Sequence, residues 1–320
     1  MSSAPPDLSN VTGPLLLGYL FNYGLYGVLA VQTYIYYTAF PNDRKVFQYL
    51  VYGIFLVETM QTIMITYDAF QQFAYGFANV EALDKIHLIW FDCCIVDGLV
   101  AFCVQVYFAY RIHLLSRSKA LAGVVLFMAL TQFAGATAAG ILAKIANSFA
   151  LLRERCFIAG CIWLGGSAAV DITIAVSMTY ILSRYDTGFQ ETQDLVKRLI
   201  RLTMETGSLT AAVAIIDLAL FLAFPAEDYH ITPALALAKF YSNSLLVVFN
   251  SRVRIHGGRG SDSTADSKGA VAWSNRGQTS ITGPAIRLDV QESVWTDPIP
   301  LERFGPALSQ KSPRDSDQGV

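Results

Sequence analysis

Four side chains that could do chemistry lie inside apolar stretches of the sequence: Glu58, Asp97, Lys239 and Asn243. A charge at mid-membrane costs about 2.5 to 3.5 kcal/mol on insertion scales, so it is paired, neutral or beside a wet cavity. Helical rise of about 1.5 Å per residue puts Lys239, Glu58 and Asp97 roughly 11, 12 and 15 Å below one membrane surface. Asn243 shares a helix face with Lys239, four residues earlier. We therefore take these four residues as the candidate ligand-binding group.

Two interpretations of this group remain open. Lys239, Glu58 and Asp97 could form a small-molecule site in a central cavity, or a buried salt bridge that fixes the register of the helices. Under both interpretations, an orphaned buried charge costs more than an absent pair. Lys239→Ala is therefore expected to destabilise the fold unless Glu58 or Asp97 is neutralised with it.

Asp171 and Glu205 form a second candidate pair, because the same helical rise puts both roughly 21 Å from that surface. Arg201 precedes Glu205 by four residues, so Glu205 could instead belong to an interfacial ion pair. Asp92 and Asp217 are expected nearer the surface, where water could reach them.

No pattern typical of an enzyme or a metal site is present in the sequence. All five cysteines lie between residues 93 and 161, and an odd number of this kind is not a disulfide framework. One bridge is a candidate, from Cys94 or its neighbour Cys93 to Cys156; the alternative is that all five are small buried side chains. Since there is no metal-ligand set and no nucleophile beside a base, we expect no catalytic residues and no cofactor.

The elements that carry these residues are expected to be membrane-spanning helices. The chain of 320 residues is 53% hydrophobic and 15% charged, with a mean hydropathy of +0.41, which is too apolar for a soluble domain. A spanning helix needs about 20 mostly apolar residues. Such stretches cover residues 14–38, 46–67, 87–110, 120–143, 157–182, 199–224 and 232–250. The sequence therefore predicts an all-α membrane protein built as a bundle of seven transmembrane helices.

Small residues are frequent in the fourth stretch, where three pairs spaced by four residues would let neighbouring helix backbones approach closely. The pairs are Ala134 with Ala138, Gly135 with Ala139, and Ala136 with Gly140.

Basic residues predict the orientation, because those beside membrane spans stay on the cytoplasmic side. Here they gather after the first, third and fifth stretches and at the start of the tail. We predict an extracellular N-terminus (1–13), a transmembrane domain (14–250) and a cytoplasmic tail (251–320), in the plasma membrane or another membrane of the secretory pathway. The tail is polar and rich in Gly, Ser and Pro, so we predict that it is disordered. Asn10, in the triplet Asn10-Val11-Thr12, is a glycosylation candidate on the predicted outer side.

The lipid bilayer is the first partner that this organisation implies. A net charge of −2 argues against a nucleic-acid partner, whose footprint is basic. Seven spans and a modifiable tail favour a receptor-like protein that senses or binds a small molecule and contacts a G protein or another cytoplasmic partner through its loops and tail. The segment Ala109-Tyr110-Arg111, however, lacks the acid that precedes the base in typical G-protein-coupled receptors.

Two other functions agree with parts of the sequence. A transporter or lipid-handling protein would use buried acids and a cation. Carrier sites are usually marked by proline or glycine breaks in matched halves, but the prolines near the spans all lie at their ends, and no repeat is seen. A lysine in the last span with acids in the third suggests a retinal Schiff base and its counter-ion. The sixth span has no Trp and no Pro to line a retinal pocket, so a pigment is less favoured.

Several stretches resemble one family: residues 14–27 (PLLLGYLFNYGLYG), 58–62 (ETMQT), 198–207 (RLIRLTMETG) and 239–246 (KFYSNSLL). They are similar to motifs of a large set of uncharacterised seven-span integral membrane proteins of mushroom-forming (basidiomycete) fungi, defined by a domain of unknown function. The resemblance covers residues 13–254. It implies a seven-helix architecture and a fungal source but no activity, and it places Glu58, Glu205, Lys239 and Asn243 in signature stretches.

Overall fold

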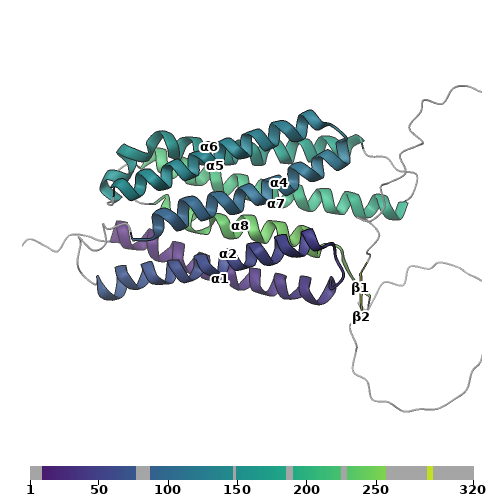
Figure 1. Cartoon of the computed structure of the whole chain (residues 1–320), viewed down its shortest axis with the longest axis horizontal. Helices are drawn as coiled ribbons and strands as arrows, with labels where there is room; N and C mark the ends of the chain where they lie inside the picture. Colours follow the sequence, from purple (N-terminus) through teal and green to yellow (C-terminus); the bar gives the residue numbers. More distant parts are fainter. Residues whose placement is uncertain are drawn as a thin grey trace, which may run out of the picture. The chain divides into compact units, whose positions relative to one another are not determined.

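The computed structural model describes residues 9–76, 87–146, 149–184, 190–224, 229–256 and 287–290 (Figure 1). Helices dominate these residues, and two short π-helical segments extend the second span and begin the third. The elements are α1 (Ser9–Ala39), α2 (Lys45–Ala69), the π-helix η1 (Phe70–Tyr75), the π-helix η2 (Trp90–Val96), α4 (Asp97–Ser116), α5 (Lys119–Ala146), α6 (Phe149–Arg184), α7 (Gln190–Ala223), α8 (Ile231–Asn250), β1 (Val253–His256) and β2 (Arg287–Val290).

Within the described ranges, seven helices are long and apolar enough to cross a membrane. This confirms the predicted fold class of a seven-helix membrane bundle. Strands β1 and β2 pair antiparallel, with Val253 opposite Val290. The sequence did not predict this pairing, and the rest of the predicted disordered tail lies outside the described residues, as do the side chains before Thr12, including that of Asn10.

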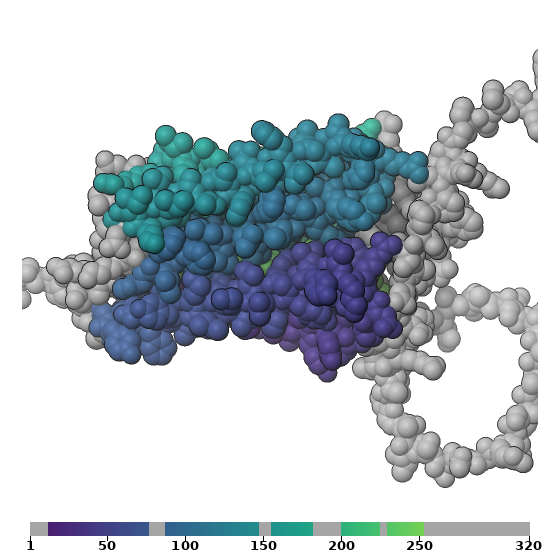
Figure 2. All heavy atoms as spheres, viewed as in Figure 1, coloured from purple at the N-terminus to yellow at the C-terminus, as the bar shows by residue number. Residues whose placement is uncertain are grey.

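Helix α8 is the most deeply buried span, and side chains of the surrounding helices cover it almost completely on the face seen in Figure 2. It runs parallel to α1. The Thr232 hydroxyl donates to the carbonyl of Pro14 at 2.8 Å, and the Asn250 amide donates to the carbonyl of Gln32 at 2.9 Å. Both pairs are 218 residues apart, so α1 and α8 stay in register over most of their length. We call the end where α1 begins the N-terminal end of the bundle, and the other the C-terminal end.

The small residues of α5 face two different neighbours. A Cβ atom built on Gly140 would lie 2.9 Å from the carbonyl oxygen of Trp90 in η2, and one on Gly135 would lie 3.0 Å from the backbone nitrogen of Trp163 in α6. The pairs that contain these glycines are buried. The third predicted pair, Ala134 with Ala138, is exposed on the outside of the bundle, so it does not bring helices together.

An ion pair ties α8 to the connection between α1 and α2 at the C-terminal end. Arg252 Nη2 lies 2.5 Å from Asp43 Oδ2, and the Tyr36 hydroxyl donates to the same oxygen at 2.8 Å. Burial would raise the pKa of Asp43, but the hydrogen bond and charge of Arg252, with help from Tyr36, hold this pKa below its ordinary value of 3.8. Asp43 is therefore an ionised anchor for the end of α8.

Candidate functional site

A buried ion pair joins α8 to α2. Lys239 Nζ contacts the carboxylate of Glu58, and both side chains are 0% exposed. The same amine donates to Gln61 Oε1 at 2.7 Å and to the backbone carbonyl of Glu58 at 3.3 Å. Since Gln61 is three residues after Glu58, one turn of α2 supplies every acceptor that Lys239 uses. The lysine is thus held by two side chains and a carbonyl of a single helix.

A third helix joins this network through Gln61. The Gln61 amide donates to Asp97 Oδ1 at 2.5 Å, so Asp97 reaches Lys239 only through the glutamine. The hydroxyl of Ser242, three residues after Lys239 on α8, donates to the other carboxylate oxygen of Glu58. We call Glu58, Gln61, Asp97, Lys239 and Ser242 the lysine network. It connects α2, α4 and α8 and combines three of the four predicted site residues.

Asn243 lies outside the lysine network. Its amide donates to the carbonyl of Leu25 in α1 at 3.1 Å and to the carbonyl of Lys239 in its own helix at 2.7 Å. The side chain therefore helps to fasten α8 to α1, one turn from the lysine network.

The π-helix η2 brings two acids toward the interior. In an α-helix, residues five apart such as Asp92 and Asp97 point about 140° away from each other. The wider turn of a π-helix, with i→i+5 hydrogen bonds, reduces this separation, and such turns are frequent at functional sites. Asp92 and Asp97 are 0% and 1% exposed. Asp92 was expected near a membrane surface, where water could reach it. The structure instead buries this side chain in the bundle.

Asp217 of α7 is buried in the same way. It is 0% exposed, again in contrast to the expected wetted position. Among the described residues, neither oxygen of Asp92 or of Asp217 has a hydrogen-bond partner. Asp217 lies near Cys93 and Cys94, the two residues that follow Asp92, so the two acids are in one region of the bundle.

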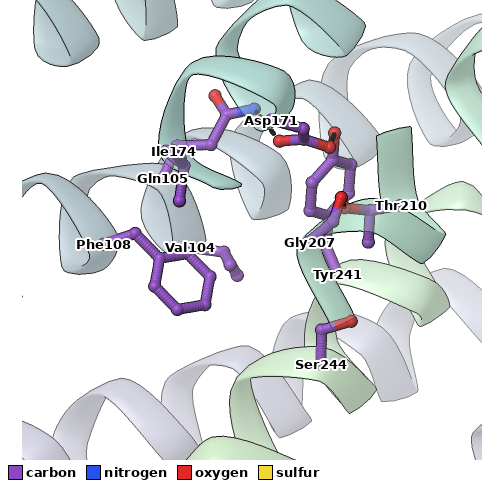
Figure 3. Close-up of a pocket in the computed structure, with 9 residues that line it drawn as sticks. All are labelled: Val104, Gln105, Phe108, Asp171, Ile174, Gly207, Thr210, Tyr241 and Ser244. Carbon is purple, nitrogen blue, oxygen red and sulfur yellow. Dashed lines mark hydrogen bonds between the residues drawn. The ribbon is translucent and has the colours of Figure 1, made fainter. Parts of the chain in front are cut away.

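A second polar cluster surrounds Asp171, nearer the C-terminal end (Figure 3). The Tyr241 hydroxyl donates to Asp171 Oδ2 at 2.7 Å and the Gln105 amide donates to Oδ1 at 3.1 Å. Ser167 is 2.7 Å from the same tyrosine oxygen. The structure does not pair Asp171 with Glu205, whose side chain is exposed on α7. The partner of Asp171 is therefore Tyr241 and not Glu205, which the sequence analysis had proposed.

A small cavity adjoins Asp171 and Tyr241, between α4, α6, α7 and α8. Its volume is about 10 Å³, roughly the space of one water molecule. Small-molecule pockets usually measure about 300 to 1,000 Å³. Binding of a larger ligand at this cavity would therefore require the four helices to separate.

The five cysteines form no disulfide bridge in the structure. All five cysteines are free thiols, so the candidate bridge between Cys94 and Cys156 is not formed; the Cys156 thiol instead donates to the carbonyl of Ala139 at 3.5 Å. Within the described part of the chain, no group of three or more His, Cys, Asp or Glu side chains could hold a metal ion.

One buried cation was missed by the sequence analysis. Arg111 was counted among the bases beside a span, but its side chain is 1% exposed and donates to the Thr203 hydroxyl of α7 at 2.5 Å. No periodic signal in the sequence distinguishes it from the bases that follow. Gln61 was expected on the inward helix face of Glu58, three residues earlier, but not as a partner of Lys239. Ser242 could have been found from its spacing of three residues from Lys239.

Residues 167–254 match the model of a family of unknown function, DUF6534. The matched segment contains the second half of α6 and all of α7 and α8, hence Lys239, Tyr241 and Asp171 but neither Glu58 nor Asp97. No curated protein and no solved structure matches the chain.

Proposed function

We propose that the protein is a receptor-like membrane protein that senses or binds a small ligand, and that ligand binding changes the pairing of side chains in the lysine network. One observation carries this proposal: the buried amine of Lys239 donates its hydrogen bonds to acceptors on α2, and Gln61 of α2 donates in turn to Asp97 of α4. An unsatisfied buried charge is costly, so Lys239 and Glu58 are stable either when paired with each other or when each has a new partner, and not in between. A ligand that replaces one partner therefore moves whole helices rather than one side chain.

Ligand binding at this site would be a population shift. A ligand changes a conformational equilibrium only by its difference in affinity for the two states. In the closed arrangement of the structure, Lys239 and Glu58 satisfy each other. A small molecule with a polar group that pairs with either side chain would favour an arrangement in which α2 and α8 separate.

The proposed orientation places the N-terminal end of the bundle outside the cell and the C-terminal end in the cytoplasm, in the plasma membrane or another secretory-pathway membrane. The distribution of basic residues supports it. In this orientation a G protein or another cytoplasmic partner would contact the end where Arg252 anchors α8. The resemblance over residues 13–254 further supports a fungal source and a seven-span family wider than the matched segment.

A thermal-shift screen tests the proposal. Purified wild-type protein in mild detergent is heated with each member of a small-molecule library, because a ligand that binds only the folded state raises the unfolding temperature. The hits are repeated on Lys239→Met/Glu58→Gln, which removes both charges together and is expected to stay folded. The matched control, Asp43→Asn, removes an ion pair far from the lysine network. Shifts retained by the double variant would count against the proposed site.

A transporter or lipid-handling protein is the second candidate. The observation that favours it is the series of buried polar side chains along the bundle axis, from Asp92 through Lys239 to Asp171 and Arg111, since carriers line their paths with such groups. Uptake into proteoliposomes, with Asp171→Asn as a test variant, distinguishes this function from sensing. A pigment is less favoured because the amine of Lys239 is already engaged by Glu58 and Gln61, whereas a Schiff base requires it to react.

A further inference from the structure

Among the described residues, the interior of the N-terminal half of the bundle holds more carboxyl groups than the buried cation Lys239 can neutralise. Glu58 is paired with Lys239. Asp97 accepts one hydrogen bond from the neutral Gln61 amide. Asp92 and Asp217 accept none from the described residues. The ammonium group of Lys239 is therefore near several acids, and it already forms an ion pair with Glu58.

The ionised form of Asp92 or Asp217 would be costly at these positions. Moving an ionised carboxylate out of water costs far more than moving its neutral form, and an unpaired buried acid therefore takes up a proton instead. Neither side chain is exposed. The Gln61 amide lies beside Asp92, but its hydrogen bond goes to Asp97, so Gln61 and the nearby charge of Lys239 offset only part of this cost.

Most of the charged or titratable groups near these acids are themselves acids, thiols or a tyrosine. Among the described residues they include Tyr19 of α1, Glu58 and Asp68 of α2, Cys93, Cys94 and Asp97 of η2 and α4, Cys156 of α6 and Lys239 of α8. Lys144 of α5 lies over the ring of Trp90, 4.5 Å from its centroid, and has an exposed side chain. His230 contacts the ring of Phe221, one turn after Asp217 on α7. Asp68 can stay ionised, because the backbone N–H of Leu88 lies 3.1 Å from each of its oxygens. The environment thus favours neutral carboxyl groups at Asp92 and Asp217.

We propose that Asp92 and Asp217 are proton-binding sites, each holding a proton at neutral pH inside the N-terminal half of the bundle. Each proton sits on a carboxyl oxygen and leaves to water when the helices separate, so no other reactant is needed. Asp92 lies beside Gln61, which contacts both Asp97 and Lys239. Loss of the Asp92 proton would place a new negative charge next to the lysine network, so proton occupancy and the Lys239–Glu58 pair are coupled. This proposal does not depend on ligand sensing.

Infrared spectroscopy of the full-length protein in lipid vesicles at neutral pH tests whether Asp92 and Asp217 are protonated. A protonated carboxyl group has a carbonyl-stretching band distinct from that of a carboxylate, and the band shifts in heavy water. We expect this band in the wild type, a loss of part of it in Asp92→Asn and in Asp217→Asn, and a larger loss in the double variant. Asp43→Asn is the matched control, because Asp43 is ionised beside Arg252 and its removal should leave the band unchanged.

Unfolding temperatures of the same variants supply a second readout. If both acids are already neutral, replacing either with the neutral amide Asn leaves the unfolding temperature unchanged or higher. Three results would overturn the proposal: no protonated-carboxyl band in the wild type, a band that neither Asn variant reduces, or a band that is present only after sodium is removed. The last would mean that the acids are ionised and hold a metal cation.

Discussion

Among the described residues, Lys239 is the cation paired with Glu58, and replacing it with Met removes that compensating charge. Both side chains are 0% exposed, so water cannot take over the lost contacts. The change removes the ammonium donor from the Glu58 carboxylate and from Gln61 Oε1, while the Ser242 hydroxyl still reaches Glu58. Met fills nearly the volume of Lys, and the loss is therefore electrostatic rather than a cavity effect.

The expected magnitude follows from the burial of the pair. Removing one partner of a buried ion pair costs about 3 to 5 kcal/mol. At about 2 to 4 °C per kcal/mol for a domain of this size, the unfolding temperature of Lys239→Met should fall by about 6 to 20 °C. Lys239→Met/Glu58→Gln removes both charges, and replacing a whole buried pair is often neutral or stabilising, so the double variant should regain most of the loss.

The assay is thermal unfolding of purified protein in one mild detergent, at one scan rate, because membrane proteins often unfold irreversibly. Glu58→Gln completes the double-mutant cycle, which isolates the coupling energy between the two residues. An unchanged unfolding temperature in Lys239→Met would refute the reasoning. So would a double variant whose loss equals the sum of the two single losses, since that result means the residues do not interact.

Three further outcomes follow from the structure. Asp43 has a pKa lowered below 3.8, so its contribution to stability is fully present above about pH 3.8 and is lost as the pH falls through the lowered value. The unfolding temperatures of wild type and Asp43→Asn should therefore differ at neutral pH and converge only when the pH is below this lowered pKa. Gly140→Val should destabilise by about 1 to 3 kcal/mol through overpacking, whereas Ala138→Val on the exposed face of the same helix should not. Tyr241→Phe should cost about 1 to 3 kcal/mol by removing a donor from a buried carboxylate, as measured by thermal unfolding, with exposed Tyr37→Phe as the neutral control.

The convergence of Lys239 with Glu58 could be predicted because depth in a membrane follows from helical rise alone. Both residues lie near the middle of long apolar stretches, where few partners are at the same level. Depth alone did not predict the neighbours of Asn243, because the packing of the helices decides which neighbour a helix face contacts. Here the Asn243 side chain contacts α1, at the carbonyl of Leu25.

The burial of Asp92 could not be predicted from a regular helix. The sequence does not mark η2 as a π-helix, and the wider turn changes which side chains point inward. Asp171 illustrates a different failure. The expected partner was another acid at equal depth, but the hydroxyl of Tyr241 satisfies the carboxylate, and tyrosines in spans resemble ordinary apolar residues when only hydropathy is considered.

The central claim, that the lysine network belongs to a ligand-binding membrane protein, is tested most directly by mass spectrometry of small molecules that copurify with the protein. The wild type and Lys239→Met/Glu58→Gln are purified side by side from the same membranes in mild detergent. The account predicts a small molecule that is retained by the wild type and absent from the double variant. Equal retention by both proteins, or no small molecule with a folded wild type, would contradict it.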